Sequence, residues 1–494
     1  MRQYLVFLTS PYISLGCPTC KSCPFSTILK TIRNSGMKVI IAAENASMSM
    51  SGESALPLYY FDRFRENHLD VWMVCHARVR DELRKRYLDE KVFQKIYFVE
   101  DSSLQVFLWK IGHFLPFRIQ DMFIGSLIHL ITQSQIRKIV RQLVATFEIQ
   151  VVYSSTPIAA KTPSFMYRVG APVIIGPMCG GLDFPPTFRK LDPLPIRLSF
   201  KVGRALADVL NRLIPGKLQA AALLVANDRT AKALPSGYRG KLYEVVESGV
   251  DLSLWPPSER PEPHPDRPTR FVYMARFVEQ KGIPFLVEAF KQVAERTNSV
   301  LELIGSGELM EETQAQVAAL GIQDKVNFYG WLPLDKAEEL MRECDVYMVP
   351  AIRDCGGCAM LEAMAIGMPV IAANWAGPGD YADDTCGIRV DLNSKEEFVD
   401  GLAAAMIRLA ESPELRQQMG KASIERVKGN YFDWDAKVKR IIEIFEEVVA
   451  HQPQYRGKSF DTPITKAGEM IGLSTELPNQ AKAKLNKSPI SPSV

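Results

Sequence analysis

The sequence predicts an α/β protein with two domains, each built on a parallel β-sheet that helices cover on both faces. Three observations support this prediction. The chain has 494 residues, which is more than one ordinary hydrophobic core accommodates. Short apolar segments alternate with amphipathic helical segments, as they do in βα units. Finally, residues 256–268 (PPSERPEPHPDRP) hold six prolines in thirteen residues, so they form a linker or an exposed loop between two such series.

The first half of the chain opens this pattern. Segments 4–8 (YLVFL) and 38–43 (KVIIAA) are strand-like and flank a helical stretch. Segments 150–155 (QVVYSS) and 172–176 (PVIIG) predict two further buried strands around a helix. Residues 104–145 predict an amphipathic helix with a basic face.

The second half alternates more regularly. Helical patterns separate its predicted strands, and two amphipathic helices (KEEFVDGLAAAMIRLAE and PELRQQMGKASIERV) follow the last strand. This order predicts a parallel sheet that is covered on both faces. The predicted strands are FVYMA (271–275), VLELIG (300–305), VNFYG (326–330), VYMVPA (346–351) and PVIAA (369–373).

These patterns divide the chain into four parts. We expect an N-terminal domain at 1–250, a C-terminal domain at 251–433, a further helix at 434–450 and a disordered polar tail at 451–494. No apolar run is long enough for a membrane-spanning helix, and MRQYLVFLTS fits a buried strand better than a signal peptide. Nine scattered cysteines favour a reducing cytosol over a disulfide scaffold. We therefore expect a cytoplasmic protein, with peripheral membrane attachment left open.

The charge is distributed unevenly. Residues 1–250 hold 32 Lys and Arg against 19 Asp and Glu, a net charge of +13, and the remainder holds 27 against 37, a net charge of −10. A basic domain suggests an anionic partner. Because no nucleic-acid motif accompanies the charge, we exclude nucleic acid and expect an anionic membrane surface or a phosphate-bearing acceptor. Ordinary solvated surface charge is the alternative.

Three stretches are expected to reach the crevice at the carboxyl ends of the sheets, which is the usual ligand site of such folds: MARFVEQKG (274–282), IGSGE (304–308) and DCGGCAMLE (354–362). Glycines at a helix start let an anion approach the backbone N–H groups. Arg276 and Lys281 add positive charge for a diphosphate. Glu362, about one turn into its helix, would accept hydrogen bonds from ribose hydroxyls.

This combination resembles the retaining nucleotide-sugar glycosyltransferases of family 4, the group 1 glycosyltransferases. The resemblance covers residues 245–449 and implies the GT-B fold, in which two Rossmann-like domains face a central crevice. It also implies that the helix at 434–450 crosses back to the N-terminal domain. The implied catalytic residues are Arg276 and Lys281 at the diphosphate and Asp354 at the transferred sugar. The implied donor-binding residues are Gly305, Gly307, Gly356, Gly357, Cys358 and Glu362.

The sequence departs from the family pattern at several places. Asp354 stands where the family usually has Glu. After the first predicted strand, SPYISLGCPTCKSC offers Gly16 in place of a glycine pair. Where many members have a His, this chain has IIGPMCGGLDFPP (174–186), so Gly180 and Gly181 are expected to shape that crevice wall. We expect packing or surface positions for three other histidines: His76, His113 and His129.

The reaction that the resemblance implies is transfer of a sugar from a nucleoside-diphosphate sugar to a lipid-linked or polysaccharide acceptor. The leaving diphosphate would deprotonate the acceptor hydroxyl on the same face, so we expect no strong base, no metal and no cofactor. Two alternatives stay open. One is a non-catalytic GT-B scaffold or sensor, supported by Asp354 and the missing His. The other is a GT-B nucleotide-sugar epimerase or hydrolase.

Two cysteine groups leave further alternatives open. Cys17, Cys20 and Cys23 have metal-like spacing without a fourth ligand nearby, so ordinary loop cysteines compete with a metal or cluster site. Cys355 and Cys358 flank the glycines at a helix start, where the pKa of a thiol tends to fall. They are either small packing residues or a redox switch.

Overall fold

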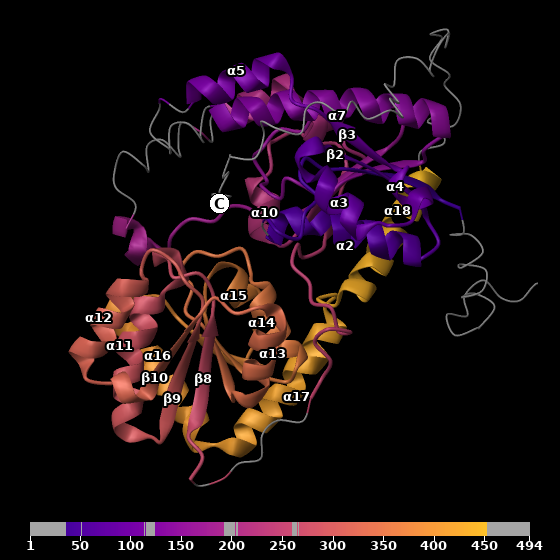
Figure 1. Ribbon diagram of the computed structural model, residues 1–494. Helices are drawn as coiled ribbons and strands as arrows, with labels where there is room; N and C mark the ends of the chain where they lie inside the picture. The colour runs from indigo at the N-terminus through magenta and orange to yellow at the C-terminus, as the bar shows by residue number, and fades with distance from the viewer. Residues whose placement is uncertain are drawn as a thin grey trace, which may run out of the picture.

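The computed structural model describes residues 36–451, except 51, 113, 115–123, 192–202, 204–205, 259–263 and 265. Within these residues the chain forms two parallel sheets with helices packed around each (Figure 1). The predicted two-sheet α/β fold is therefore confirmed. The strand predicted at 4–8, and the tail predicted after 451, lie outside the described residues.

The N-terminal sheet has seven strands in the order β3-β2-β1-β4-β5-β6-β7, and each neighbouring pair is parallel. Its central strands are apolar except at their ends, at Lys38 and Ser154, because helices and loops cover both faces. The strands are β1 (Lys38–Ala42), β2 (Asp70–His76), β3 (Ile96–Val99), β4 (Val151–Ser154), β5 (Val173–Met178), β6 (Ala222–Val225) and β7 (Lys241–Glu244).

The helices of this domain correct two expectations. Instead of one helix over 104–145, the structure has α5 (Ser103–Gly112) and α7 (Ser126–Phe147). Between β4 and β5 the chain makes turns around Pro157 and Pro163 in place of the expected helix. The other elements are α2 (Gly52–Glu66), η2 (Ala77–Val79), α3 (Arg80–Arg86), α4 (Glu90–Phe93), η4 (Pro186–Leu191), α9 (Gly216–Gln219) and α10 (Asp228–Ala233).

The C-terminal sheet has six parallel strands in the order β10-β9-β8-β11-β12-β13. It matches the predicted alternation of strands and helices. Its strands are β8 (Thr269–Met274), β9 (Ser299–Ile304), β10 (Val326–Gly330), β11 (Val346–Val349), β12 (Val370–Ala373) and β13 (Gly387–Val390). Its helices are η5 (Glu279–Lys281), α11 (Ile283–Arg296), α12 (Met310–Leu320), η6 (Gln323–Lys325), α13 (Leu334–Glu343), α14 (Cys358–Ala365), α15 (Ala376–Tyr381), α16 (Lys395–Glu411) and α17 (Pro413–Gly429).

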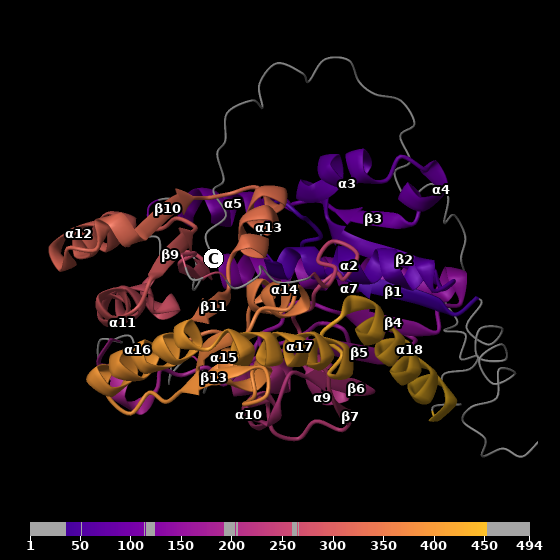
Figure 2. The same ribbon diagram turned by 90° about the horizontal axis from the view of Figure 1, so that it is seen from below.

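The last helix, α18 (Trp434–His451), runs from the C-terminal domain along the N-terminal domain (Figure 2). Trp434, Ile441 and Phe445 are buried in the same hydrophobic cluster as β1 and α2. The Trp434 ring also stacks on Tyr59 of α2, with 4.8 Å between the ring centroids. The final helix therefore ties the two domains together through the core of the first.

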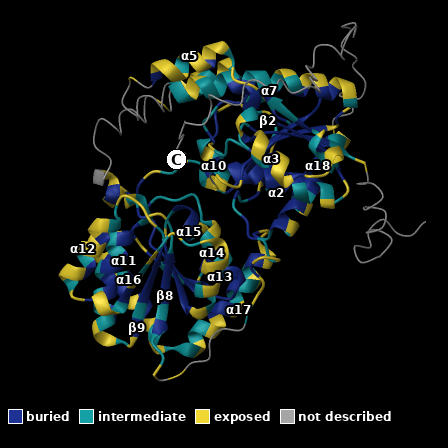
Figure 3. Ribbon diagram, viewed as in Figure 1, coloured by how far each residue is buried: buried dark blue, intermediate teal, exposed yellow. Residues whose placement is uncertain are grey.

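In both sheets the strand order reverses at a central position, between β1 and β4 and between β8 and β11. At such a switch point the loops from adjacent strands diverge, and ligands bind in the crevice beyond the carboxyl ends of the strands. The central strands of both sheets are buried, and the helices around them expose their outer faces (Figure 3). None of the helices in the described part of the chain is long and apolar enough to cross a membrane.

Candidate active site

Lys281 and Asp354 meet at the switch point of the C-terminal sheet. Lys281 ends η5, in the loop after β8, and Asp354 lies in the loop after β11, which is the neighbour of β8. The Lys281 Nζ atom donates to Asp354 Oδ2 at 2.5 Å, and both side chains are largely buried. The structure thus brings together two predicted catalytic residues that are 73 positions apart.

Arg276, the second predicted diphosphate ligand, has a different environment. It is exposed in the same loop as Lys281, and its guanidinium makes no hydrogen bond or ion pair with any residue that the structure describes. The site therefore offers one cation held by a carboxylate and one cation that is not neutralised locally.

Two predicted donor-binding glycines, Gly305 and Gly307, are required by the packing of their loop. A Cβ on Gly305 would lie 1.9 Å from the Ala275 carbonyl oxygen, and the φ of Gly305 is +131°. A Cβ on Gly307 would lie 2.5 Å from the Phe277 carbonyl oxygen. Both glycines let the loop after β9 pack against the loop that carries Arg276. Contact with a donor stays a prediction for them.

The start of α14 combines a packed glycine and an open one. A Cβ on Gly356 would lie 2.3 Å from the Tyr381 hydroxyl oxygen, and its φ of +154° also favours glycine. A Cβ on Gly357 would meet nothing closer than the Met360 nitrogen, 3.9 Å away. Because packing does not require Gly357, its missing side chain leaves space beside the first N–H groups of the helix, where an anion would bind.

Glu362 lies one turn along α14 and is half-buried. Burial raises the pKa of this carboxyl to about 7. Cys358, the first residue of α14, is exposed, but the neighbouring protein atoms desolvate its thiol and the Glu362 charge lies close by, so the pKa of the thiol is raised to about 11. This direction is opposite to the fall that the helix start alone leads one to expect.

Gly180 and Gly181, the glycines expected to shape the crevice wall, are needed for packing. A Cβ on Gly180 would lie 2.6 Å from the Ala160 Cβ atom, and a Cβ on Gly181 would lie 3.0 Å from the Arg229 side chain. Both glycines thus allow close packing inside the N-terminal domain, next to Cys179. The Cys179 thiol in turn reaches the Cys355 carbonyl oxygen at 3.9 Å, so this segment lies next to the loop that carries Asp354, and its role as a crevice wall stays a prediction. Gly16 lies outside the described residues.

Sequence reasoning missed a cavity of about 300 Å³ at the switch point of the N-terminal sheet. Residues beyond the ends of β1 and β4 line it, and it contains Glu44, Glu53 and His129. His129 is half-buried and its Nδ1 contacts the Glu44 carboxylate, a pairing that the expected packing or surface position did not specify. The segment KVIIAAENASMSMSGES, a strand followed by a glycine at a helix start, carries the signal that points here.

The other two histidines differ from His129. His76 is 2% exposed, and its Nδ1 accepts a hydrogen bond from the Arg78 N–H at 3.1 Å, which caps η2. Its expected packing position is therefore confirmed. His113 lies outside the described residues.

Residues 257–426 match the family Glycosyl transferases group 1. This part of the chain is a group 1 glycosyltransferase domain. The D-inositol 3-phosphate glycosyltransferase of Kribbella flavida is 31% identical over 237 residues, which are 44% of this chain and 54% of that protein. The lipopolysaccharide core biosynthesis glycosyltransferase LpsD of Rhizobium meliloti is 27% identical over 228 residues, 46% of this chain and 63% of that protein. The chain thus matches only part of the length of these relatives.

Solved structures extend the likeness to both domains. A glycosyltransferase from Rickettsia africae has a TM-score of 0.56 and 15% identity, covering 84% of this chain and all but 1% of its own. HepE of Anabaena, in complex with UDP, has a TM-score of 0.55 and 15% identity, covering 83% of this chain and 100% of its own. At such low identity the likeness shows the fold alone, and that fold is GT-B as predicted. The group 1 glycosyltransferase domain contains Arg276, Lys281, Asp354 and Glu362, whereas the cavity with Glu44 lies outside the matched residues.

Proposed function

We propose that this protein is a retaining glycosyltransferase that moves a sugar from a nucleoside-diphosphate sugar to an acceptor hydroxyl in polysaccharide or glycolipid biosynthesis. The observation that carries the proposal is the Lys281–Asp354 pair at the switch point of the group 1 glycosyltransferase domain. Exposed Arg276 lies in the loop that also carries Lys281, and Asp354 lies in the loop that ends at the open α14 start. A diphosphate fits this set because it is anionic and accepts hydrogen bonds from both kinds of group.

The solved likenesses support the choice of donor. HepE of Anabaena is described in complex with UDP and also with UDP-glucose. In this chain the diphosphate would lie against the first N–H groups of α14, with the ribose beside Glu362 on the next turn. The donor base and sugar are left open.

The chemical step then needs mainly charge stabilisation. As the bond from the sugar to the diphosphate breaks, negative charge grows on the leaving oxygen, and Arg276, Lys281 and the α14 start are placed to stabilise it. Asp354 holds Lys281 in place before the donor arrives and would face the transferred sugar. The leaving diphosphate takes the proton of the attacking hydroxyl, so the protein supplies no separate base.

We place the acceptor on the side of the N-terminal domain. Its cavity lies at the carboxyl end of a parallel sheet, and its polar lining suits a hydroxyl-rich molecule. A lipid-linked acceptor or a growing polysaccharide meets this requirement.

A thermal-shift screen tests the donor assignment. Nucleoside diphosphates and their sugars should raise the melting temperature of the wild-type protein, because a ligand that binds only the folded state stabilises it. Lys281→Ala and Arg276→Ala should reduce the shift. Lys336→Ala should keep it, since Lys336 is an exposed lysine of α13 that pairs with Glu339.

If no nucleotide shifts the wild type, or if Lys281→Ala responds like the wild type, the donor site is wrong. Binding without transfer to any acceptor would favour a scaffold, and donor hydrolysis without acceptor would favour a hydrolase.

A further inference from the structure

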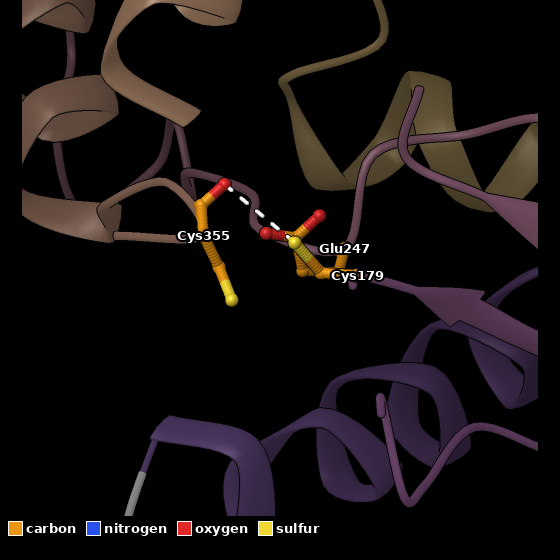
Figure 4. A group of neighbouring side chains, drawn as sticks. All are labelled: Cys179, Glu247 and Cys355. Atoms are coloured by element: carbon orange, nitrogen blue, oxygen red, sulfur yellow. Dashed lines mark hydrogen bonds between the residues drawn. The ribbon is translucent and has the colours of Figure 1, made fainter. Parts of the chain in front are cut away.

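Three potential metal ligands meet at the junction of the two domains. They are the thiols of Cys179 and Cys355 and the carboxylate of Glu247, and one ligand atom of each lies within 4.8 Å of the other two. Figure 4 shows how they come from separate segments. Cys179 follows β5, Glu247 follows β7, and Cys355 lies in the loop before α14.

Glu247 is the unusual member of this group. Its side chain is 3% exposed, and Oε1 accepts a hydrogen bond from the Tyr381 hydroxyl at 3.2 Å. Oε2 is buried and has no hydrogen-bond partner among the described residues. A buried carboxylate oxygen without a partner is costly, so it calls for a ligand.

The nearby buried cation does not satisfy this oxygen. Lys437 Nζ donates to the Ser248 carbonyl oxygen and lies over the Trp434 ring, and no ion pair joins Lys437 to Glu247 within the described part of the chain. Cys179 is also directed elsewhere, because its thiol reaches the Cys355 carbonyl oxygen at 3.9 Å. A cation between the three ligand atoms would satisfy Glu247 Oε2 and would replace the long Cys179 contact as the thiol loses its proton.

We propose that Cys179, Glu247 and Cys355 bind one thiophilic divalent cation, Zn²⁺. Two thiolates and a carboxylate form a ligand set that suits this ion, and three protein ligands leave a fourth position open. Binding releases the two thiol protons to solvent as two S–Zn bonds form. Cys355 is half-buried, which gives the ion a route to the site.

The proposed ion would join both domains at one point. It would fix Cys355 and thereby the adjacent Gly356, whose position against Tyr381 shapes the start of α14. It would lie beside the loop that carries Asp354, with its fourth position filled by water. This inference stands apart from the proposed transferase reaction, which needs no metal.

Cobalt binding tests the site, since Co²⁺ replaces Zn²⁺ in tetrahedral sites and thiolate ligands give it a strong near-ultraviolet absorption. The experiment uses the full-length, reduced chain. It is done in the wild type and in a background that carries Cys17→Ser, Cys20→Ser and Cys23→Ser, because that cysteine group is a competing ligand set. We expect one Co²⁺ per chain in this background, with the thiolate absorption displaced by Zn²⁺.

The variants identify the ligands. In the same background, Cys179→Ser and Cys355→Ser should each abolish the absorption, and Glu247→Gln, which keeps the shape of the side chain, should weaken affinity by about tenfold or more. Cys358→Ser and Cys75→Ser are matched controls and should bind Co²⁺ like the background chain. Metal-free melting temperatures check that the variants fold. The proposal is overturned if no Co²⁺ binds, or if the substitutions at Cys17, Cys20 and Cys23 by themselves abolish the absorption. It is also overturned if Cys179→Ser or Glu247→Gln binds Co²⁺ as tightly as the background chain.

Discussion

Glu362 provides a prediction about pH. The pKa of this carboxyl is raised to about 7 in the folded protein against 4.5 ordinarily, so between these values the folded chain holds a proton that the unfolded chain has released. Raising the pH through this window therefore lowers the free energy of unfolding, by roughly 2 kcal/mol for a carboxyl that still reaches solvent. Glu362→Gln should remove this part of the slope.

Urea unfolding at about pH 5 and about pH 8 measures the effect as a difference between wild type and variant. Taking the difference cancels the contributions of other groups that titrate in the same window. An equal pH dependence in the two proteins would show that the Glu362 carboxyl has an ordinary pKa.

A substitution in the Lys281–Asp354 pair should affect diphosphate binding and turnover differently. Asp354→Asn keeps the size of the side chain but removes the charge that balances Lys281. We expect the nucleoside diphosphate to bind the variant at least as well as the wild type, because the Asn amide oxygen still accepts from Lys281 while the anionic competitor is gone. Turnover should fall, because the contact with the transferred sugar loses its charge. Calorimetric titration and initial rates on the same preparation test this. Weaker diphosphate binding with normal turnover would reverse the roles assigned to the pair.

Helix α5 reverses the usual burial pattern of a surface helix: it buries a polar side chain and exposes apolar ones. Gln105 is buried against Thr132 of α7, with Nε2 to Oγ1 at 2.8 Å. Phe107 and Ile111, one turn apart, are 58% and 43% exposed instead. Figure 3 shows α5 largely exposed, and most of its exposed residues are apolar. In a domain with excess positive charge, such a helix fits the surface of an anionic bilayer.

We therefore expect the protein to float with anionic vesicles, less so as salt rises. The double variant Phe107→Ser, Ile111→Ser should reduce vesicle binding by about tenfold or more, since each apolar side chain contributes roughly 1.5–3 kcal/mol when buried. Leu334→Ser, at an exposed leucine of α13 in the other domain, is the control. Equal binding to neutral and anionic vesicles would show that charge does not drive the attachment. Unchanged binding of the double variant would show that α5 is not the membrane contact.

The C-terminal domain could be predicted more completely than the N-terminal one, for a physical reason. Its strands are short apolar runs between strongly periodic helices. Its site residues lie in the loops after strands or at the following helix start, so the pattern that predicts the strands also locates the site. In the N-terminal domain, α5 buries Gln105 and exposes Phe107, so tertiary contacts override the pattern that a helix normally shows. The group formed by Cys179, Glu247 and Cys355 has no spacing that indicates a metal, because only the packing of the domains brings it together.

Across both domains, Arg63 of α2 connects the parts of the molecule. Its guanidinium binds Asp251 at 2.6 Å and Asp435 of α18 at 3.1 Å, and its side chain is 11% exposed. Arg63→Met should lower the free energy of unfolding by about 1–3 kcal/mol, because it leaves the largely buried Asp251 without its partner. Arg84→Met is the matched control. It breaks an exposed pair with Glu90 and should cost at most about 1 kcal/mol in urea unfolding. Equal losses would mean that Arg63 does not join the domains.

The most direct test of the proposed function is the steady-state rate of sugar transfer by Lys281→Ala, with the donor found in the thermal-shift screen and with melting temperatures checked first. Lys281 would stabilise charge that grows only as the sugar leaves, so we expect kcat to fall on the order of 10²-fold or more while Lys336→Ala keeps the wild-type rate. A folded Lys281→Ala protein that transfers sugar as fast as the wild type would contradict the assignment of the active site to this crevice.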